Sequence, residues 1–160
     1  MIDGSLQDTR ALIFDLSPPI LYEVGLEAAI ERLAEEMEDR HQFKCIFRDD
    51  GRAKRVDPTT RTFLFQAARE LLMNVSRHSG AEEVRIEIGR DHDFVRLRVS
   101  DNGAGFDASE AALKIHENGG FGLFNIRERV ESLGGRFELV SRPGRGTTCT
   151  LIAPMGGSGE

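Results

Sequence analysis

Long hydrophobic runs, paired cysteines and a basic leader segment are all missing from this sequence. A transmembrane helix needs about 20 consecutive apolar residues, and no stretch of the 160-residue chain approaches that length. Cys45 and Cys149 stand alone in apolar stretches without metal-ligand spacing, so we interpret both as small core residues in a reducing compartment. The N-terminus lacks the basic and then apolar segments of a secretory signal. We therefore expect a cytoplasmic chain without direct membrane contact.

An excess of positive charge is missing as well. The 21 Lys and Arg residues are outnumbered by 27 Asp and Glu residues, which gives a formal net charge of -6 at pH 7. Such a balance argues against a surface for nucleic acid or anionic lipid. Hydrophobic residues at 39% and charged residues at 30% are ordinary for a globular protein, and this length suits one domain with a single core.

Hydrophobic periodicity predicts three amphipathic helices and five strands. The helices are expected over residues 25–41, 60–81 and 123–133, and the strands over residues 43–48, 83–89, 94–100, 136–141 and 147–153. The last four strands form two hairpins whose residues alternate between apolar and polar. We predict an α+β fold, a two-layer α/β sandwich with a mixed, mostly antiparallel sheet and about three helices on one face.

The helix predicted over residues 60–81 carries an unusual polar edge beside its apolar stripe. Glu70 and Asn74 are four residues apart and lie one helical turn above each other, and Arg77 and His78 extend the same edge. Asparagine is disfavoured within helices, and such polar groups are costly to bury without partners. A purely structural role remains open for each, most of all for Glu70, because glutamate suits helices, and for His78, because a histidine at a helix end is often only a cap or a surface residue.

Two glycine-rich loops supply a partner for this polar edge. The first spans residues 100–106 after a strand, and the second spans residues 118–123 before a helix. Glycines allow close approach of backbone N–H groups, and a helix N-terminus favours anions. Mg²⁺ prefers oxygen ligands and shares phosphate oxygens. The amide oxygen of Asn74, the carboxylate of Glu70 and backbone N–H groups near Gly120 and Gly122 would suit a nucleoside triphosphate with Mg²⁺.

Four motifs in order resemble the N, G1 and G2 boxes and the closing strand of the GHKL ATPase superfamily, also known as the histidine kinase-like ATPase (HATPase_c) domains: ELLMNVSRHSGA, VSDNGAGFD, GGFGLFNIRERVESLGG and SRPGRGTTCTLIAP. Their spacing is most similar to the nitrate-sensor/degradation-sensor class of two-component sensor histidine kinases. The resemblance implies ATP and Mg²⁺ as cofactors, with Asn74 as the metal ligand and Glu70 as the base or water-positioning group. It also implies that Asp101 reads adenine.

The resemblance extends nucleotide binding to a larger set of residues. It comprises Asn74, Arg77, His78, Asp101, Gly103, Gly105, Gly120, Gly122, Leu123, Thr147 and Thr148. Residues between Asp107 and Asn118 would form a lid over the nucleotide. A plain Asp-Asn-Gly turn is the alternative interpretation of Asp101, although Gly103 and Gly105 favour the binding loop.

The resemblance also implies an arrangement of domains and partners. Residues 1–18 would be a remnant of the dimerisation and phosphoacceptor hairpin and the linker, residues 19–155 the ATP-binding catalytic domain, and residues 156–160 a disordered tail. The partners would be ATP or ADP, the hairpin of the same kinase and a downstream response regulator. None of the four histidines has the context of a phosphoacceptor, so the isolated chain is expected to lack its own acceptor.

Two other members of the superfamily are alternatives. A regulatory serine kinase or anti-sigma-type binding module would share the fold, but the junction TRALIFDLSPPILYEVGL suits sensor kinases better. Mechanical ATPases of the gyrase, mismatch-repair or heat-shock chaperone kind need a long lid and a transducer domain. The segment between the two glycine loops is short for such a lid.

Overall fold

The sheet of this protein has five strands, four of them in two hairpins. The computed structural model describes residues 18–107 and 121–156. The strands are β1 (Lys44–Asp49), β2 (Glu83–Asp91), β3 (Phe94–Asp101), β4 (Arg136–Ser141) and β5 (Thr147–Pro154), in the order β1-β2-β3-β5-β4. The β1–β2 pair is parallel and the other three pairs are antiparallel. The predicted mixed, mostly antiparallel sheet is therefore confirmed.

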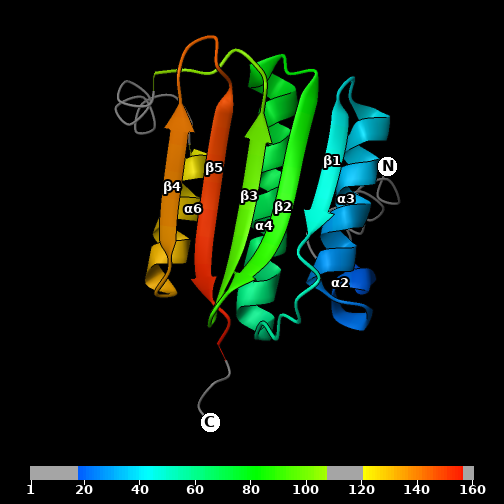
Figure 1. Ribbon diagram of the computed structural model, residues 1–160, viewed down its shortest axis with the longest axis vertical. Coiled ribbons are helices and arrows are strands. Elements are labelled where there is room, and N and C mark those ends of the chain that lie inside the picture. The colour runs from blue at the N-terminus through cyan, green and yellow to red at the C-terminus, as the bar shows by residue number, and fades with distance from the viewer. Residues whose placement is uncertain (1–17, 108–120, 157–160) are drawn as a thin grey trace, which may run out of the picture.

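The helices lie on one face of the sheet and form the second layer (Figure 1). They are α2 (Pro19–Glu23), α3 (Leu26–Arg40), α4 (Pro58–Asn74) with its π-helical extension η1 (Val75–Ser79), and α6 (Phe121–Ser132). The three long ones correspond to the three predicted helices. The short α2 is not among the predicted helices. Pro19 occupies the first turn of α2, where its missing N–H costs no hydrogen bond.

The core lies between the two layers and follows the predicted alternation. Val84, Ile86 and Ile88 of β2 and Val95, Leu97 and Val99 of β3 are buried, while alternate charged residues face away from the helices. The helix layer supplies Leu64, Ala68 and Leu72 of α4, together with residues of α3 and α6. Burial raises the pKa of the Cys149 thiol to about 12. Cys149 is thus a core residue, as predicted, whereas Cys45 is only half-buried.

The helix predicted over residues 60–81 begins two residues earlier, and its last turn has a different geometry. Asp57 caps α4, with its Oδ1 atom accepting the Thr60 N–H at 2.8 Å, so the helix begins at Pro58. The α-helical part ends at Asn74, and the chain continues in π-helical geometry through Ser79. Gly80 ends the segment in the left-handed conformation, with φ of 64°.

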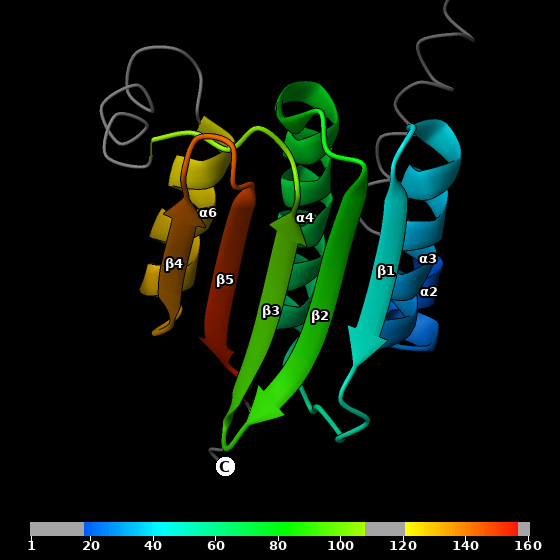
Figure 2. The ribbon, with the colours of Figure 1, turned by 45° about the horizontal axis from the view of Figure 1, so that its top comes forward.

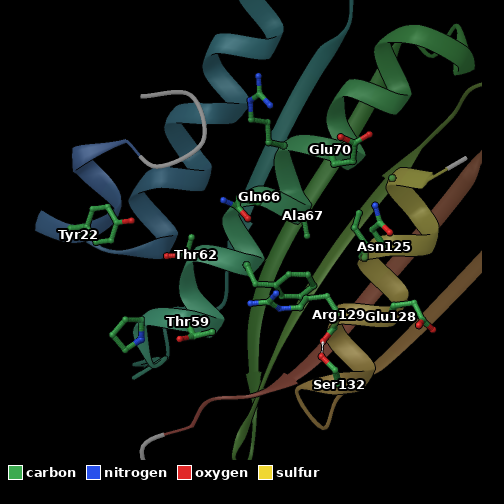
Figure 3. Close-up of a pocket in the computed structure, with 15 residues that line it drawn as sticks. Tyr22, Thr59, Thr62, Gln66, Ala67, Glu70, Asn125, Glu128, Arg129 and Ser132 are labelled. Carbon is green, nitrogen blue, oxygen red and sulfur yellow. Dashed lines mark hydrogen bonds between the residues drawn. The ribbon is translucent and has the colours of Figure 1, made fainter. Parts of the chain in front are cut away.

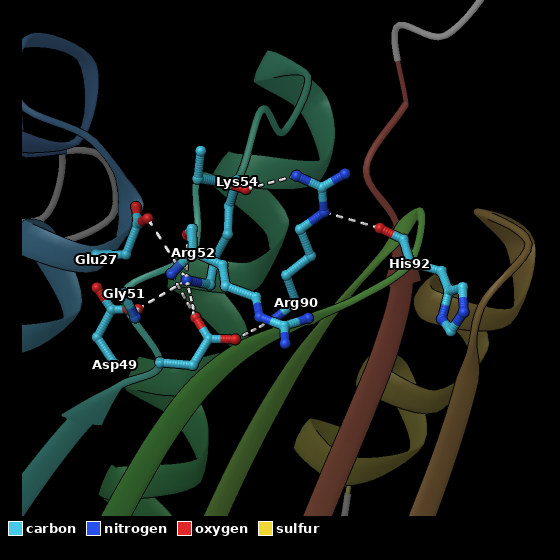
Figure 4. A network of polar contacts seen from close by, with 9 residues as sticks. Glu27, Asp49, Gly51, Arg52, Lys54, Arg90 and His92 are labelled. Carbon is cyan, nitrogen blue, oxygen red and sulfur yellow. Dashed lines mark hydrogen bonds and ion pairs between the residues drawn. The ribbon is translucent and has the colours of Figure 1, made fainter.

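A polar network fixes the loop between β1 and α4, at the end of the sheet where β1 and β2 finish (Figure 4). The Lys54 side chain is fully buried, and its Nζ atom lies 2.7 Å from Asp49 Oδ1 and 2.6 Å from Asp50 Oδ1. The backbone N–H groups of Arg52 and Arg90 donate to the Asp50 carboxylate at 3.0 and 2.7 Å. Burial alone would raise the pKa of Asp50, but these hydrogen bonds and the Lys54 charge hold it well below its usual range.

Candidate functional site

The predicted site residues come from segments that gather at one end of the molecule. The C-terminal end of α4 with η1, the end of β3, the turn between β4 and β5 and the beginning of α6 all lie at the top of Figure 1, and Figure 2 shows the same grouping from a second direction. This is the opposite end from the Lys54 network. The fold therefore brings together segments that are far apart in the sequence.

Glu70 and Asn74 lie one turn apart on α4, and both are half-buried. The carboxylate of Glu70 faces the first turn of α6. A Cβ atom built on Gly122 would lie 2.5 Å from Glu70 Oε2 and 2.9 Å from its Cδ atom. The N-box and G2-box segments therefore approach each other more closely than a side chain at position 122 would allow.

The π-helical turn begins directly after Asn74. The backbone N–H of Val75 points at the carbonyl oxygens of both Leu71 and Leu72, four and three residues before it, and π-helical geometry follows from Val75 to Ser79. Ser76 contributes a hydrogen bond from its hydroxyl to the Met73 carbonyl at 2.8 Å. Arg77 is exposed on this turn. The π turn thus sets the direction of the backbone for the basic residues that follow Asn74, although the side chain of His78 lies outside the described part of the structure.

Asp101 is the last residue of β3 and is held by backbone donors. Its Oδ1 atom accepts the Gly103 N–H at 2.8 Å, and the N–H of Thr147 also donates to the carboxylate. Burial raises the pKa of Asp101 above its usual value, and these two hydrogen bonds only partly offset that effect. Asp101 and Thr147 face each other in the β3–β5 ladder, and the next pair of residues is Ser100 and Thr148. Asp101, Thr147 and Thr148 therefore lie side by side at one end of the sheet.

The loop after β3 packs backbone to backbone against the turn between β4 and β5. Gly105 has φ of 67°, and a Cβ atom there would collide with the Arg142 carbonyl oxygen. Gly146 has φ of 74°, and a Cβ atom there would collide with the Asp101 carbonyl oxygen. Both positions need glycine for conformation and for space. The second glycine of the G1 loop therefore keeps that loop against the β4–β5 turn.

Two residues that the sequence analysis did not select tie these loops together. The buried Ser141 hydroxyl accepts the Phe106 N–H at 2.9 Å and lies 2.7 Å from Thr147 Oγ1. The side chain of Asn102 accepts the backbone N–H groups of Glu82 and Glu83, both at 3.0 Å. In the sequence, Ser141 and Asn102 are distinguished only by lying next to a glycine-rich motif. That position does not predict a hydrogen bond to a distant residue.

The remaining predicted site positions are Gly120, the lid, Leu123 and Gly103. Gly120, and the predicted lid except Asp107, lie outside the described residues. Leu123 packs against the core from the first turn of α6. Gly103 is half-buried at the start of the G1 loop.

A groove of about 1090 Å³ runs between α4 and α6 (Figure 3). Its lining comprises Tyr22, Pro58, Thr59, Thr62, Phe63, Gln66, Ala67, Arg69, Glu70, Gly122, Asn125, Ile126, Glu128, Arg129 and Ser132. Of the predicted site residues, it includes Glu70 and Gly122, whereas Asn74, Asp101 and Thr147 lie outside it. A nucleotide that contacts both Glu70 and Asp101 would therefore extend beyond this groove.

The residues at this end fit a phosphate-bound metal ion better than a metal ion held by protein alone. Within residues 18–107 and 121–156, no group of three or more His, Cys, Asp or Glu side chains could hold a metal ion. Asn74 offers one hard oxygen donor, which suits Mg²⁺ when phosphate oxygens and waters complete its coordination.

The part of the chain described by the structure contains no helix with the length and apolar character of a membrane span.

Comparisons with known proteins identify the family to which the chain belongs. The family described as histidine kinase-, DNA gyrase B-, and HSP90-like ATPase matches residues 59–157. The chain is 32% identical over 153 residues to the sensor histidine kinase MctS of Rhizobium johnstonii, a match covering 96% of this chain and 32% of that protein. It is 28% identical over 155 residues to the histidine-protein kinase/phosphatase DegS of Brevibacillus brevis, covering 97% and 39%. The chain thus spans well under half the length of these relatives.

The fold has a counterpart among solved structures. The blue-light activated histidine kinase of Erythrobacter litoralis EL346 superposes with a TM-score of 0.70 at 20% sequence identity. This match covers 95% of the present chain and 49% of that protein. The likeness confirms the α+β architecture, with a sheet on one side and helices on the other.

Proposed function

Because the chain belongs to the family of histidine kinase-, DNA gyrase B-, and HSP90-like ATPases, we propose that it is the ATP-binding catalytic domain of a bacterial two-component sensor histidine kinase. One observation carries the proposal: a relative named as a sensor histidine kinase and one named as a signal transduction histidine-protein kinase/phosphatase align over 96% and 97% of the chain. Residues 19–155 form the catalytic domain in this proposal. The domain is cytoplasmic, whether or not the parent kinase is anchored in a membrane.

Asn74 is proposed to hold Mg²⁺ through its side-chain oxygen. When bound with ATP, Mg²⁺ supplies neutralisation of the charge on the phosphates. Arg77 lies one turn further along and adds a positive charge that the phosphates can approach, because its side chain is exposed. His78 and Gly120 complete the proposed phosphate side of the site. The contribution of the protein is to orient the triphosphate and to hold charge next to it.

Asp101 is proposed to recognise adenine. A carboxylate that already accepts the N–H groups of Gly103 and Thr147 has its orientation fixed, and its remaining lone pairs can accept the exocyclic amine of adenine. Thr147 and Thr148 lie beside it and support the base. The G1 loop, held by Gly105 and Ser141, forms the wall of this part of the site.

Glu70 is proposed as the base or orienting group at the γ-phosphate. It lies one turn before Asn74 on the same helix, so it faces the same end of the nucleotide as the proposed metal ligand. A histidine of the hairpin domain would attack the γ-phosphate in line, and a response regulator would receive the phosphoryl group afterwards. Residues 1–18 connect the domain to that hairpin in this proposal.

Two measurements test the proposed function. Isothermal titration calorimetry should detect binding of ATP and ADP to the isolated chain, with higher affinity in the presence of Mg²⁺. A purified phosphoacceptor hairpin of the parent kinase, mixed with the chain and γ-labelled ATP, should gain acid-labile label. A chain that binds ATP but labels a serine residue of an added regulator, and not the hairpin, would instead be a regulatory serine kinase.

A further inference from the structure

Glu70 of α4 lies against the first turn of α6, at Gly122. The space that a side chain at position 122 would fill is taken by Glu70: a Cβ atom there would lie 2.5 Å from Oε2, 2.9 Å from Cδ and 3.0 Å from Cγ. Real Cβ atoms do not approach other atoms so closely. The conformation of Gly122 does not require glycine, since it lies within α6 and does not have a positive φ. The requirement at position 122 is therefore one of space.

The two helices cannot easily separate to make room for a side chain. Leu71 and Leu72 of α4 are buried against the sheet directly after Glu70, and Ile126 and Val130 of α6 are buried one and two turns after Gly122. Shifting either helix would disturb this packing, which is costly in a close-packed core. The Glu70 side chain, in contrast, is long, half-buried and free to change rotamer. A methyl group at position 122 would therefore move the Glu70 carboxylate and leave the helices in place.

We propose that Gly122 is the residue that positions the Glu70 carboxylate, and that its lack of a side chain matters for phosphoryl transfer more than for holding phosphate. This inference rests on the proposed function, because it gives Glu70 its role at the γ-phosphate. Displacement of a catalytic group by about 1 Å lowers a rate by about 10²-fold. The substitution Gly122→Ala is thus expected to slow transfer while leaving ATP affinity almost unchanged.

A thermal double-mutant cycle tests the contact without any kinase assay. The melting temperatures of the wild type, Gly122→Ala, Glu70→Ala and the double variant are compared by calorimetry. Alanine is favoured over glycine within a helix by about 1 kcal/mol, so Gly122→Ala should raise the melting temperature in the Glu70→Ala background, where the space is free. In the wild type, where Glu70 must move, the same substitution should raise the melting temperature less or lower it. Equal shifts in the two backgrounds would overturn the proposal, because Gly122 would then act independently of Glu70.

A kinetic double-mutant cycle tests the expected effect of Gly122→Ala on the rate of phosphoryl transfer. The transfer rate to an added hairpin at saturating ATP is measured for Gly122→Ala, Glu70→Gln and their combination, with Asn125→Ala as a matched control one turn along the same groove wall. Gly122→Ala should reduce the rate at least about tenfold, and the combination should be no slower than Glu70→Gln alone. A weaker ATP affinity with an unchanged rate would overturn the proposal and assign Gly122 to phosphate binding. If the wild type shows no transfer, the proposed function fails, and the thermal cycle still decides whether Gly122 positions Glu70.

Discussion

Asp101 and Thr147 face each other at the ends of β3 and β5, and the backbone N–H of Thr147 donates to the Asp101 carboxylate. The same carboxylate accepts the Gly103 N–H at 2.8 Å. One side chain therefore connects the sheet to the G1 loop and still has lone pairs for a ligand. This carboxylate is half-buried, and the partial loss of its contact with water raises its pKa. A ligand that donates a hydrogen bond to the Asp101 carboxylate can replace part of the solvation that burial removes.

Adenine selectivity is the first prediction from this arrangement. GTP should compete much more weakly than ADP for the chain, because the guanine carbonyl would face the Asp101 oxygens without a proton between them. An unpaired buried group of this kind costs about 1–3 kcal/mol. Asp101→Asn should reduce the preference for adenine, while its amide oxygen can still accept the Gly103 N–H and preserve the loop. Displacement of a fluorescent ATP analogue by GTP and ADP measures both effects, and equal competition by the two nucleotides would remove Asp101 from base recognition.

Loss of metal-dependent affinity is the second prediction. Asn74→Ala should abolish most of the gain in ATP affinity that Mg²⁺ provides, because a methyl group offers no oxygen ligand. The fold should persist, since Asn74 lies on the polar edge of α4 and not among its buried leucines. Calorimetric titrations with and without Mg²⁺ compare Asn74→Ala with the exposed control Gln66→Ala on the same helix. Equal Mg²⁺ dependence in the wild type and Asn74→Ala would show that the metal is held elsewhere.

Local signals in the sequence predicted most of the fold. The alternation of Val84, Ile86 and Ile88 with polar residues predicts which face of β2 is buried, and this prediction needs no information about distant residues. The start of α4 could also be predicted from local sequence, because the adjacent residues Asp57 and Pro58 form a capping signal. The spacing of Glu70 and Asn74 placed them on one edge of a helix, and their proposed roles came from the resemblance to the GHKL superfamily.

Features that depend on tertiary contacts were not predictable from one sequence. The π turn after Asn74 departs from the regular α-helical pattern, and no residue type specifies it. Ser141 contacts Phe106 across a long stretch of sequence, so its hydroxyl looked like any other serine in a strand. The interpretation of Gly122 as a phosphate ligand likewise missed the approach of Glu70, which appears only when α4 and α6 are packed together.

The network around Lys54 yields a third prediction, on stability. Lys54→Met should lower the melting temperature by about 2–4 °C, the shift that about 1 kcal/mol produces for a chain of this length. The substitution leaves Asp49 and Asp50 close together without their shared cation. Lys44→Met, at an exposed position on β1, is the matched control and should change the melting temperature little.

The same network predicts how stability depends on pH. The pKa of Asp50 is lowered by folding, so its ionised form favours the folded state. This contribution is present above the ordinary carboxyl pKa of 3.8 and is lost as the pH falls below that value toward the lower pKa of the folded state. The free energy of unfolding of the wild type should therefore fall below about pH 4, and that of Lys54→Met should fall less. Parallel pH profiles for the two proteins would contradict the assignment of this effect to Lys54 and Asp50.

The final prediction concerns phosphoryl transfer by the isolated chain. The proposed nucleotide residues are present, but none of the four histidines has the context of an acceptor. The chain should therefore not label itself with γ-labelled ATP, and it should label a phosphoacceptor hairpin supplied separately. This reaction should be slow and should need a high hairpin concentration, because the effective concentration of a covalently attached neighbour is absent.

Glu70→Gln should lower the transfer rate by about 10²-fold and change the ATP dissociation constant far less, as expected for a group that acts in the transition state. Gel separation of the two proteins after the reaction shows which one carries acid-labile label. Label on the chain itself without any hairpin would contradict the proposal that its acceptor lies in another domain.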